Sequence, residues 1–278
     1  MKRLISLAFI SLKEIIKQPF YYVILFSGCL IILMSFSFTF FAFGEEARMI
    51  RNMGISTITI CGLLAGCLSS SILITSEFER QTTLAVLSKP ITRIHFILGK
   101  YLGVITASAA LILFQGLVLE TALMIHEYLK ISNIEHHAHN QSVKSLIDYY
   151  CLLVDHYCLL GIYFSLLQIM ILTAIAVIFS LYFNLTGTLI ICFLIYIFCH
   201  TFSYIFPYHS RDLNIVSIMI SICYVVFPNL HNLSMITIND PIFKPTYIDI
   251  LYTSLYSIIY SVSVLWLATV CFKRKEIV

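Results

Sequence analysis

Leu159–Phe179 reads LLGIYFSLLQIMILTAIAVIF, a run of 21 residues without a charged side chain. A helix needs about 20 consecutive apolar residues to cross the roughly 30 Å hydrocarbon core of a bilayer. The run contains no proline, and its single glycine lies near its start. It therefore predicts a transmembrane helix, which we place within Leu152–Phe183.

Similar apolar runs recur along the whole chain of 278 residues, of which 60% are hydrophobic and 11% charged, with a mean hydropathy of +0.94. Soluble domains carry roughly 25% charged residues, so a soluble fold is excluded. The other predicted spans are Phe20–Phe43, Ile55–Thr75, Ile97–Ile125, Thr186–Phe206 and Ile250–Phe272. We expect an all-α fold, a polytopic membrane helix bundle with six transmembrane helices in one domain, residues 1–278.

Two further segments are apolar without having the pattern of a full span. Residues 1–19 place Lys13 and Lys17 on one side of a helix and Leu12 and Ile15 on the other, which predicts an amphipathic interfacial helix that ends at a proline. Residues 213–227 are too few for a span and are followed by Pro228, so we expect a re-entrant or interfacial segment before the last span.

The distribution of lysine and arginine predicts the orientation. Under the six-span prediction, eleven of the 17 basic residues fall on one side of the membrane and six on the other. The richer side is expected to be cytoplasmic. The prediction is therefore a multi-pass protein of the cell inner (cytoplasmic) membrane with both termini cytoplasmic and an extracytoplasmic loop at residues 126–151. The lipid membrane is thus an expected partner, and the small net charge of +3 gives no reason to expect nucleic acid.

The longest charged cytoplasmic segment is residues 76–96, which begins SEFERQTTLAVLSKPITR. Its charged start, apolar centre and proline-marked turn are typical of a short helix that docks on a soluble partner. A solvated connection between two spans explains the same composition equally well.

This segment resembles the loop after the second span in type-2 ABC exporter permeases. The residues that match are Glu77, Glu79, Arg80, Thr82, Ser88, Lys89, Pro90, Arg93, Phe96, Gly99 and Lys100. The amphipathic N-terminal helix and Phe227–Leu230 before the last span look like the subgroup related to copper-enzyme-maturation and antibiotic-export permeases. Gln81 departs from a glycine that some members have, which puts the local turn in doubt.

The resemblance implies that two permeases, either two copies or a copy and a paralogue, form a dimer with a pathway at their interface. It also implies that the loop engages a separate ATP-binding subunit. The implied ATPase-coupling residues are Glu77, Glu79, Arg80, Thr82, Lys89, Pro90 and Arg93. The chain has no Gx4GK[ST] motif, so ATP is expected on the partner subunit, and no catalytic residue or cofactor is expected in this chain.

Two more sets of residues have side chains that suit a functional site. His136, His137 and His139 are weak candidates for a metal site, although adjacent loop histidines are more often simple polar surface. Glu120 is the acid placed deepest in an apolar run and is a possible pathway residue; alternatively, its side chain extends to the membrane interface.

Two further classes of function are compatible with the same sequence. A membrane-embedded enzyme would use the histidine cluster and Asp155, whereas a channel or assembly scaffold would work without an ATPase. The sequence H126-E-Y-L-K130 lacks the second histidine of the HExxH zinc-protease motif. This disfavours a zinc protease, while a membrane enzyme of another kind, a channel and a scaffold stay open.

Overall fold

The computed structural model describes residues 2–35, 37, 46–79, 93–135, 156–205, 227–230, 233 and 247–274. These residues form seven α-helices and no strand. The helices are α1 (Lys2–Ile16), α2 (Pro19–Met34), α3 (Glu46–Glu79), α5 (Arg93–Glu135), α7 (His156–Ser180), α8 (Leu185–Ile205) and α11 (Tyr247–Arg274). The predicted all-α fold is confirmed.

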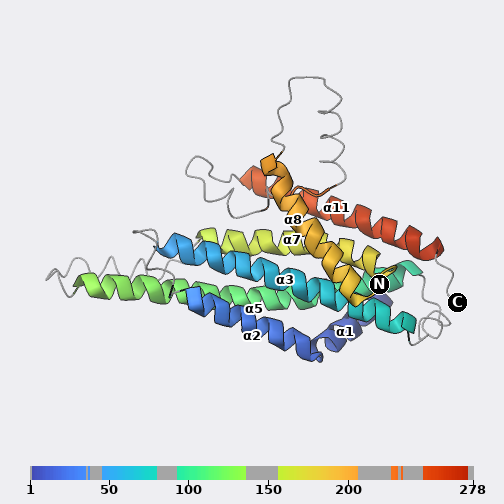
Figure 1. Ribbon diagram of the computed structural model, residues 1–278, viewed down its shortest axis with the longest axis horizontal. Coiled ribbons are helices and arrows are strands. Elements are labelled where there is room, and N and C mark those ends of the chain that lie inside the picture. The colour runs from blue at the N-terminus through green and yellow to red at the C-terminus, as the bar shows by residue number, and fades with distance from the viewer. Residues whose placement is uncertain are drawn as a thin grey trace, which may run out of the picture.

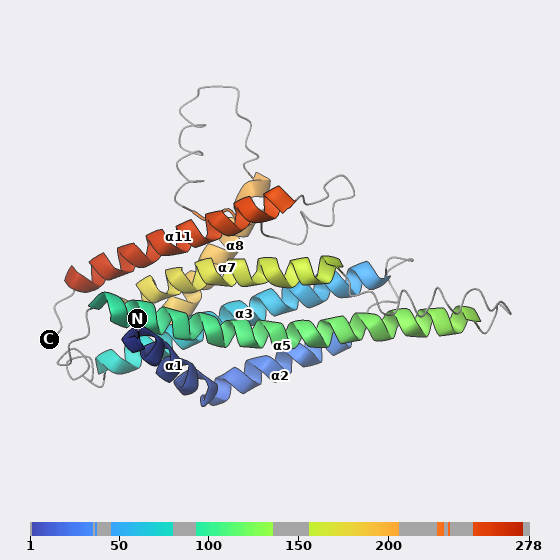
Figure 2. The same ribbon diagram turned by 180° about the vertical axis from the view of Figure 1, so that it is seen from behind.

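The helices form an elongated bundle in which α2, α3, α5 and α7 run side by side (Figure 1). Helix α11 packs on α7 and α5, and α8 crosses the bundle obliquely in contact with α3 and α7 (Figure 2). The start of α1 and the end of α11 lie at the same end of the bundle. We call this the proximal end, and the end at which α3 begins the distal end.

Five helices are long and apolar enough to cross a membrane, and α1 with α2 adds a sixth if the pair counts as one bent span. The bend is 67° and lies at Gln18 and Pro19. Proline is favoured at the first turn of a helix, where its missing N–H costs no hydrogen bond. The predicted proline break between the N-terminal helix and the first span is therefore confirmed, and the protein is a multi-pass helical membrane protein.

Several helices extend beyond their apolar runs. Helix α5 continues to Glu135, so residues 126–135 of the predicted extracytoplasmic loop are helical. Helix α3 continues to Glu79 and α5 begins at Arg93, which shortens the predicted loop at 76–96 to residues 80–92. Hydropathy marks only the part of a helix that lies in lipid, whereas helical hydrogen bonds propagate through polar turns that lack glycine and proline.

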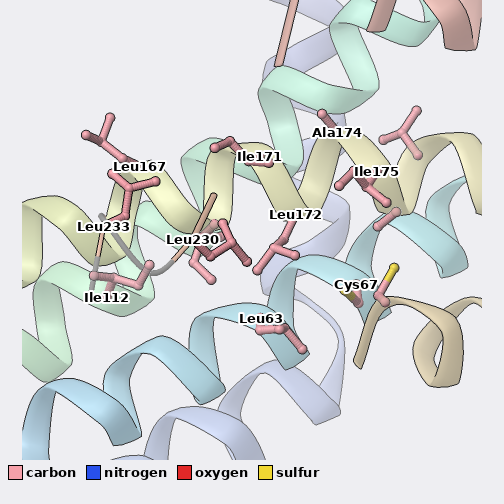
Figure 3. Close-up of a cluster of buried hydrophobic side chains, with 14 of the residues drawn as sticks. Leu63, Cys67, Ile112, Leu167, Ile171, Leu172, Ala174, Ile175, Leu230 and Leu233 are labelled. Carbon is pink, nitrogen blue, oxygen red and sulfur yellow. The ribbon is translucent and has the colours of Figure 1, made fainter. Parts of the chain in front are cut away.

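The core lies where α3, α5 and α7 meet. A Cβ atom at Gly62 of α3 would lie 2.9 Å from Ile112 of α5 and 3.0 Å from Ile169 of α7, so these three residues share one depth in the bundle. Figure 3 shows the surrounding cluster of buried side chains, which includes Leu63, Ile112 and Leu172. The same cluster contains Leu230 and Leu233, which lie outside the α-helices.

Candidate functional site

A non-helical piece of chain lies deep in the helical bundle. Residues Phe227–Leu230 are not helical, and Leu230 and Leu233 are 0% and 1% exposed. We call Phe227–Leu230 together with Leu233 the core turn. Pro228 lacks an N–H, and the Leu230 N–H donates to the Pro228 carbonyl at 2.9 Å, which closes a tight turn. Non-helical backbone occurs at membrane depth only where protein or a water-filled cavity surrounds it. Of the predicted re-entrant or interfacial segment, residues 213–227, only Phe227 is described, so this expectation stays a prediction.

Gln168 of α7 holds the core turn. Its Nε2 donates to the Leu233 carbonyl at 2.8 Å and to the Leu230 carbonyl at 3.3 Å. Gln168 is 3% exposed and lies at the midpoint of α7, twelve residues from either end (168 − 156 and 180 − 168). One amide therefore satisfies two carbonyls at the centre of a span, where an unsatisfied carbonyl costs several kcal/mol in lipid.

Two further helices contact the same turn. The Asn229 N–H donates to the Tyr256 hydroxyl of α11 at 3.0 Å. The ring of Phe227 packs edge-on against Phe198 of α8, with centroids 4.9 Å apart. The core turn is thus held from α7, α8 and α11, and a displacement of any of these three helices changes its surroundings.

Other polar contacts cross the bundle interior. Thr59 of α3 and Ser165 of α7 share a hydrogen bond of 2.9 Å, and the Tyr101 hydroxyl of α5 donates to the Met170 carbonyl at 3.1 Å. Gln115 of α5 donates to two carbonyls of α2, those of Ile24 and Leu25, at 3.3 Å each. Interhelical hydrogen bonds of this kind hold membrane helices in register because lipid supplies no hydrophobic drive for their association.

A second arrangement lies at the proximal end, where α1, α5 and α11 meet. Phe96 of α5 stacks on Phe272 of α11, with centroids 5.8 Å apart and planes 13° from parallel. A Cβ at Gly99 would lie 2.5 Å from Leu7 of α1, so only glycine admits α1 this closely. Lys100 is 3% exposed, and its Nζ lies 3.9 Å from Glu14 of α1 and 5.9 Å from the centre of the Phe96 ring. We call Leu7, Glu14, Phe96, Gly99, Lys100 and Phe272 the proximal joint.

Three of the predicted ATPase-coupling residues belong to the same end of the molecule. Glu77 and Glu79 lie in the last turn of α3, and Arg93 is the first residue of α5. The ends of these two helices lie beside the start of α1 in both views (Figures 1 and 2). Arg80, Thr82, Lys89 and Pro90 lie outside the described residues, so their role stays a prediction.

Another candidate, Glu120, lies in the distal half of α5. Glu120 is 8% exposed and faces the bundle, which disagrees with a side chain that extends to the membrane interface. Near the distal end, His126 Nε2 of α5 lies 3.3 Å from Glu46 of α3, and the Arg51 guanidinium lies 5.3 Å from the centre of the Tyr157 ring. His136, His137 and His139 lie outside the described residues, and within the described ranges no group of three metal-ligating side chains lies together.

No protein-family model matches the chain, and no curated protein matches it. The functional assignment therefore depends on the geometry of the chain itself. The sequence pattern singled out Phe96, Gly99 and Lys100 in one motif, but it missed Gln168, Tyr256 and Phe272. Glutamine and tyrosine inside an apolar run were the only available signal for the first two, since such residues need a partner in lipid.

Proposed function

We propose that this protein is the membrane-spanning permease subunit of an ATP-driven exporter of the type-2 ABC class. In this proposal a separate subunit binds and hydrolyses ATP, and a second permease, a copy or a paralogue, completes the pathway. Both termini face the cytoplasm of a cell whose inner membrane holds the protein.

The observation that carries the proposal is the proximal joint. Phe96, Gly99 and Lys100, which belong to the motif that resembles the exporter loop, contact both α1 and α11. A force that the ATP-binding subunit exerts on residues 77–93 therefore displaces the end of α3 and the start of α5. Because α5 contacts α1 and α11 at the proximal joint, these two helices are displaced as well. A plain loop between two spans needs no such joint.

A path of contacts leads from this joint to the core turn. Phe96 stacks on Phe272, and α11 continues from Phe272 to Tyr256, whose hydroxyl accepts the Asn229 N–H. Because helices are stiff along their axes, a tilt of α11 at the proximal end displaces Tyr256, which contacts the core turn. In the proposed mechanism this displacement opens and closes the pathway, with Glu120 as a lining residue in the distal half.

The test is co-purification from native membranes. The tagged full-length protein is expected to bring down a polypeptide with a Gx4GK[ST] motif and ATPase activity. Glu79→Lys and Pro90→Gly are expected to lower the recovered ATPase, or its stimulation by substrate, severalfold at normal membrane abundance. Glu127→Lys is the matched control, because Glu127 is exposed in the distal part of α5 and the charge reversal is the same.

The outcomes separate the proposal from its rivals. Parent protein that brings down no ATPase contradicts the exporter and favours a channel or scaffold. Parent, Glu79→Lys and Pro90→Gly proteins that recover equal ATPase activity contradict the docking assignment alone. A chemical reaction catalysed by the purified chain would favour the membrane-embedded enzyme.

A further inference from the structure

Helix α1 has one face packed on the protein and the rest exposed. Ser11 and Ile15 are both 0% exposed and lie against the bundle. The contact is close, since a Cβ at Gly103 of α5 would lie 2.5 Å from the Ser11 Cβ and 2.9 Å from the Ala8 carbonyl oxygen. The predicted apolar side of this helix is therefore only partly used by the protein, and Ile5 remains exposed.

The exposed part of α1 includes two adjacent sectors, while Ile10 and Glu14, which are also exposed, fall beyond the second. At about 100° per residue, Ile5, Phe9 and Ile16 fall together beside the packed face. Ile5 and Phe9 are 63% and 65% exposed. Lys13 and Lys17 fall in the next sector and are exposed as well, and the helical turn reaches Lys17 because its N–H donates to the Lys13 carbonyl at 3.3 Å. We call Ile5, Phe9, Lys13 and Lys17 the α1 strip.

The depth of α1 follows from its contacts along α5. Ile112 of α5 shares the depth of Ile169, next to the midpoint of α7. Gly103 lies nine residues before Ile112, or about 14 Å at 1.5 Å per residue. Half of the hydrocarbon core is about 15 Å. Helix α1 therefore crosses α5 at the boundary between hydrocarbon and headgroups.

We infer that the α1 strip binds anionic phospholipid. The bend of 67° sets α1 across the direction of the span that follows it, so that the helix lies along the membrane surface. The apolar sector then enters the acyl chains, and the lysine sector lies at the height of the lipid phosphates. Charge complementarity selects the lipid, since each lysine near an anionic surface contributes a several-fold preference that salt weakens.

The experiment uses quenching of tryptophan fluorescence by brominated lipid. The only native tryptophan, Trp266, is replaced in the full-length protein by Trp266→Phe, and Phe9→Trp places a reporter in the α1 strip. The protein is reconstituted in phosphatidylcholine vesicles that contain brominated phosphatidylglycerol or brominated phosphatidylcholine. The matched control carries Leu194→Trp instead, since Leu194 is an exposed residue in the middle of α8.

The Phe9→Trp reporter is expected to prefer brominated phosphatidylglycerol by about threefold or more at low salt. Lys13→Gln with Lys17→Gln, or high salt, is expected to reduce this preference to that of the Leu194→Trp control, which is near one. Both lysines are exposed, so the double variant is expected to keep its size-exclusion profile. A preference that survives the double variant overturns the inference, as does equal quenching by the two lipids. A reporter that neither lipid quenches overturns it too, because the α1 strip then lies outside the acyl chains.

Discussion

The ring of Phe96 lies nearly parallel to that of Phe272, with the two centroids 5.8 Å apart. Both side chains are buried, although they belong to the first turn of one span and to the end of the last. Residues 176 positions apart in the sequence (272 − 96) thus join the segment after the charged loop to the C-terminal helix. The stack therefore joins the start of α5 to the end of α11.

This contact is expected to be cooperative. Stacked aromatic pairs contribute about 0.5–1.5 kcal/mol beyond their buried area. Phe96→Leu and Phe272→Leu together should therefore destabilise the protein by less than the sum of the single variants, with a coupling energy in that range. Unfolding by denaturing detergent in mixed micelles measures it. The control is Phe26→Leu, on an exposed face of α2, whose effect should add to that of either variant. Additive effects of Phe96→Leu and Phe272→Leu would contradict an energetic link between the two rings.

The close approach of α1 to α5 predicts a steric rescue. In Gly99→Ala the new methyl group would lie 2.5 Å from Leu7 Cδ2, so we expect a loss of about 1–3 kcal/mol in stability. Shortening the facing side chain with Leu7→Ala should recover part of that loss in the double variant. Gly187→Ala is the control, since its methyl group would meet nothing closer than 3.3 Å. Failure of the rescue would mean that Gly99 serves backbone geometry and not helix packing.

The sequence predicted the apolar spans well and the ends of the helices poorly. Runs such as Leu159–Phe179 show a span directly, because lipid requires an uninterrupted apolar surface. Glu135 ends α5 in polar sequence, where neither periodicity nor a glycine or proline marks the boundary. Composition therefore locates the part of a helix in lipid and leaves its extensions unmarked.

The candidate site was less predictable for a different reason. Gln168 is one polar residue in an apolar run, and its role depends on where a distant turn folds back. The contact of Phe272 could not be predicted, because a phenylalanine in a transmembrane helix packs against lipid as readily as it packs against another aromatic ring. Long-range pairs of this kind leave no mark on local periodicity, whereas the Phe96, Gly99 and Lys100 motif was visible because its residues are close in sequence.

Topology is tested by labelling single cysteines in intact cells. The start of α1 and the end of α11 share one end of the bundle, which agrees with termini on one side of the membrane. The excess of basic residues predicts that this side is cytoplasmic. After replacement of the accessible native cysteines, Asn140→Cys should react with an impermeant thiol reagent and Ser88→Cys should not. The reverse pattern would invert the orientation and place the predicted ATPase-coupling segment on the wrong side for ATP.

The last prediction concerns Gln168 and the core turn. Gln168→Leu removes the donor to the Leu230 and Leu233 carbonyls while nearly preserving volume, so the turn keeps its apolar packing but loses its polar anchor. We expect a loss of about 1–3 kcal/mol in unfolding free energy, because the buried Leu233 carbonyl loses this donor, while the Leu230 carbonyl still accepts the Leu233 N–H at 3.1 Å. Tyr256→Phe removes only one hydrogen bond, to the exposed Asn229 N–H, and should cost less. The two variants differ in transport as well: if the turn gates a pathway, Gln168→Leu should alter transport at equal membrane abundance. A Gln168→Leu protein as stable and as active as the parent would show that neither carbonyl depends on this amide and that the core turn is held by its leucines alone.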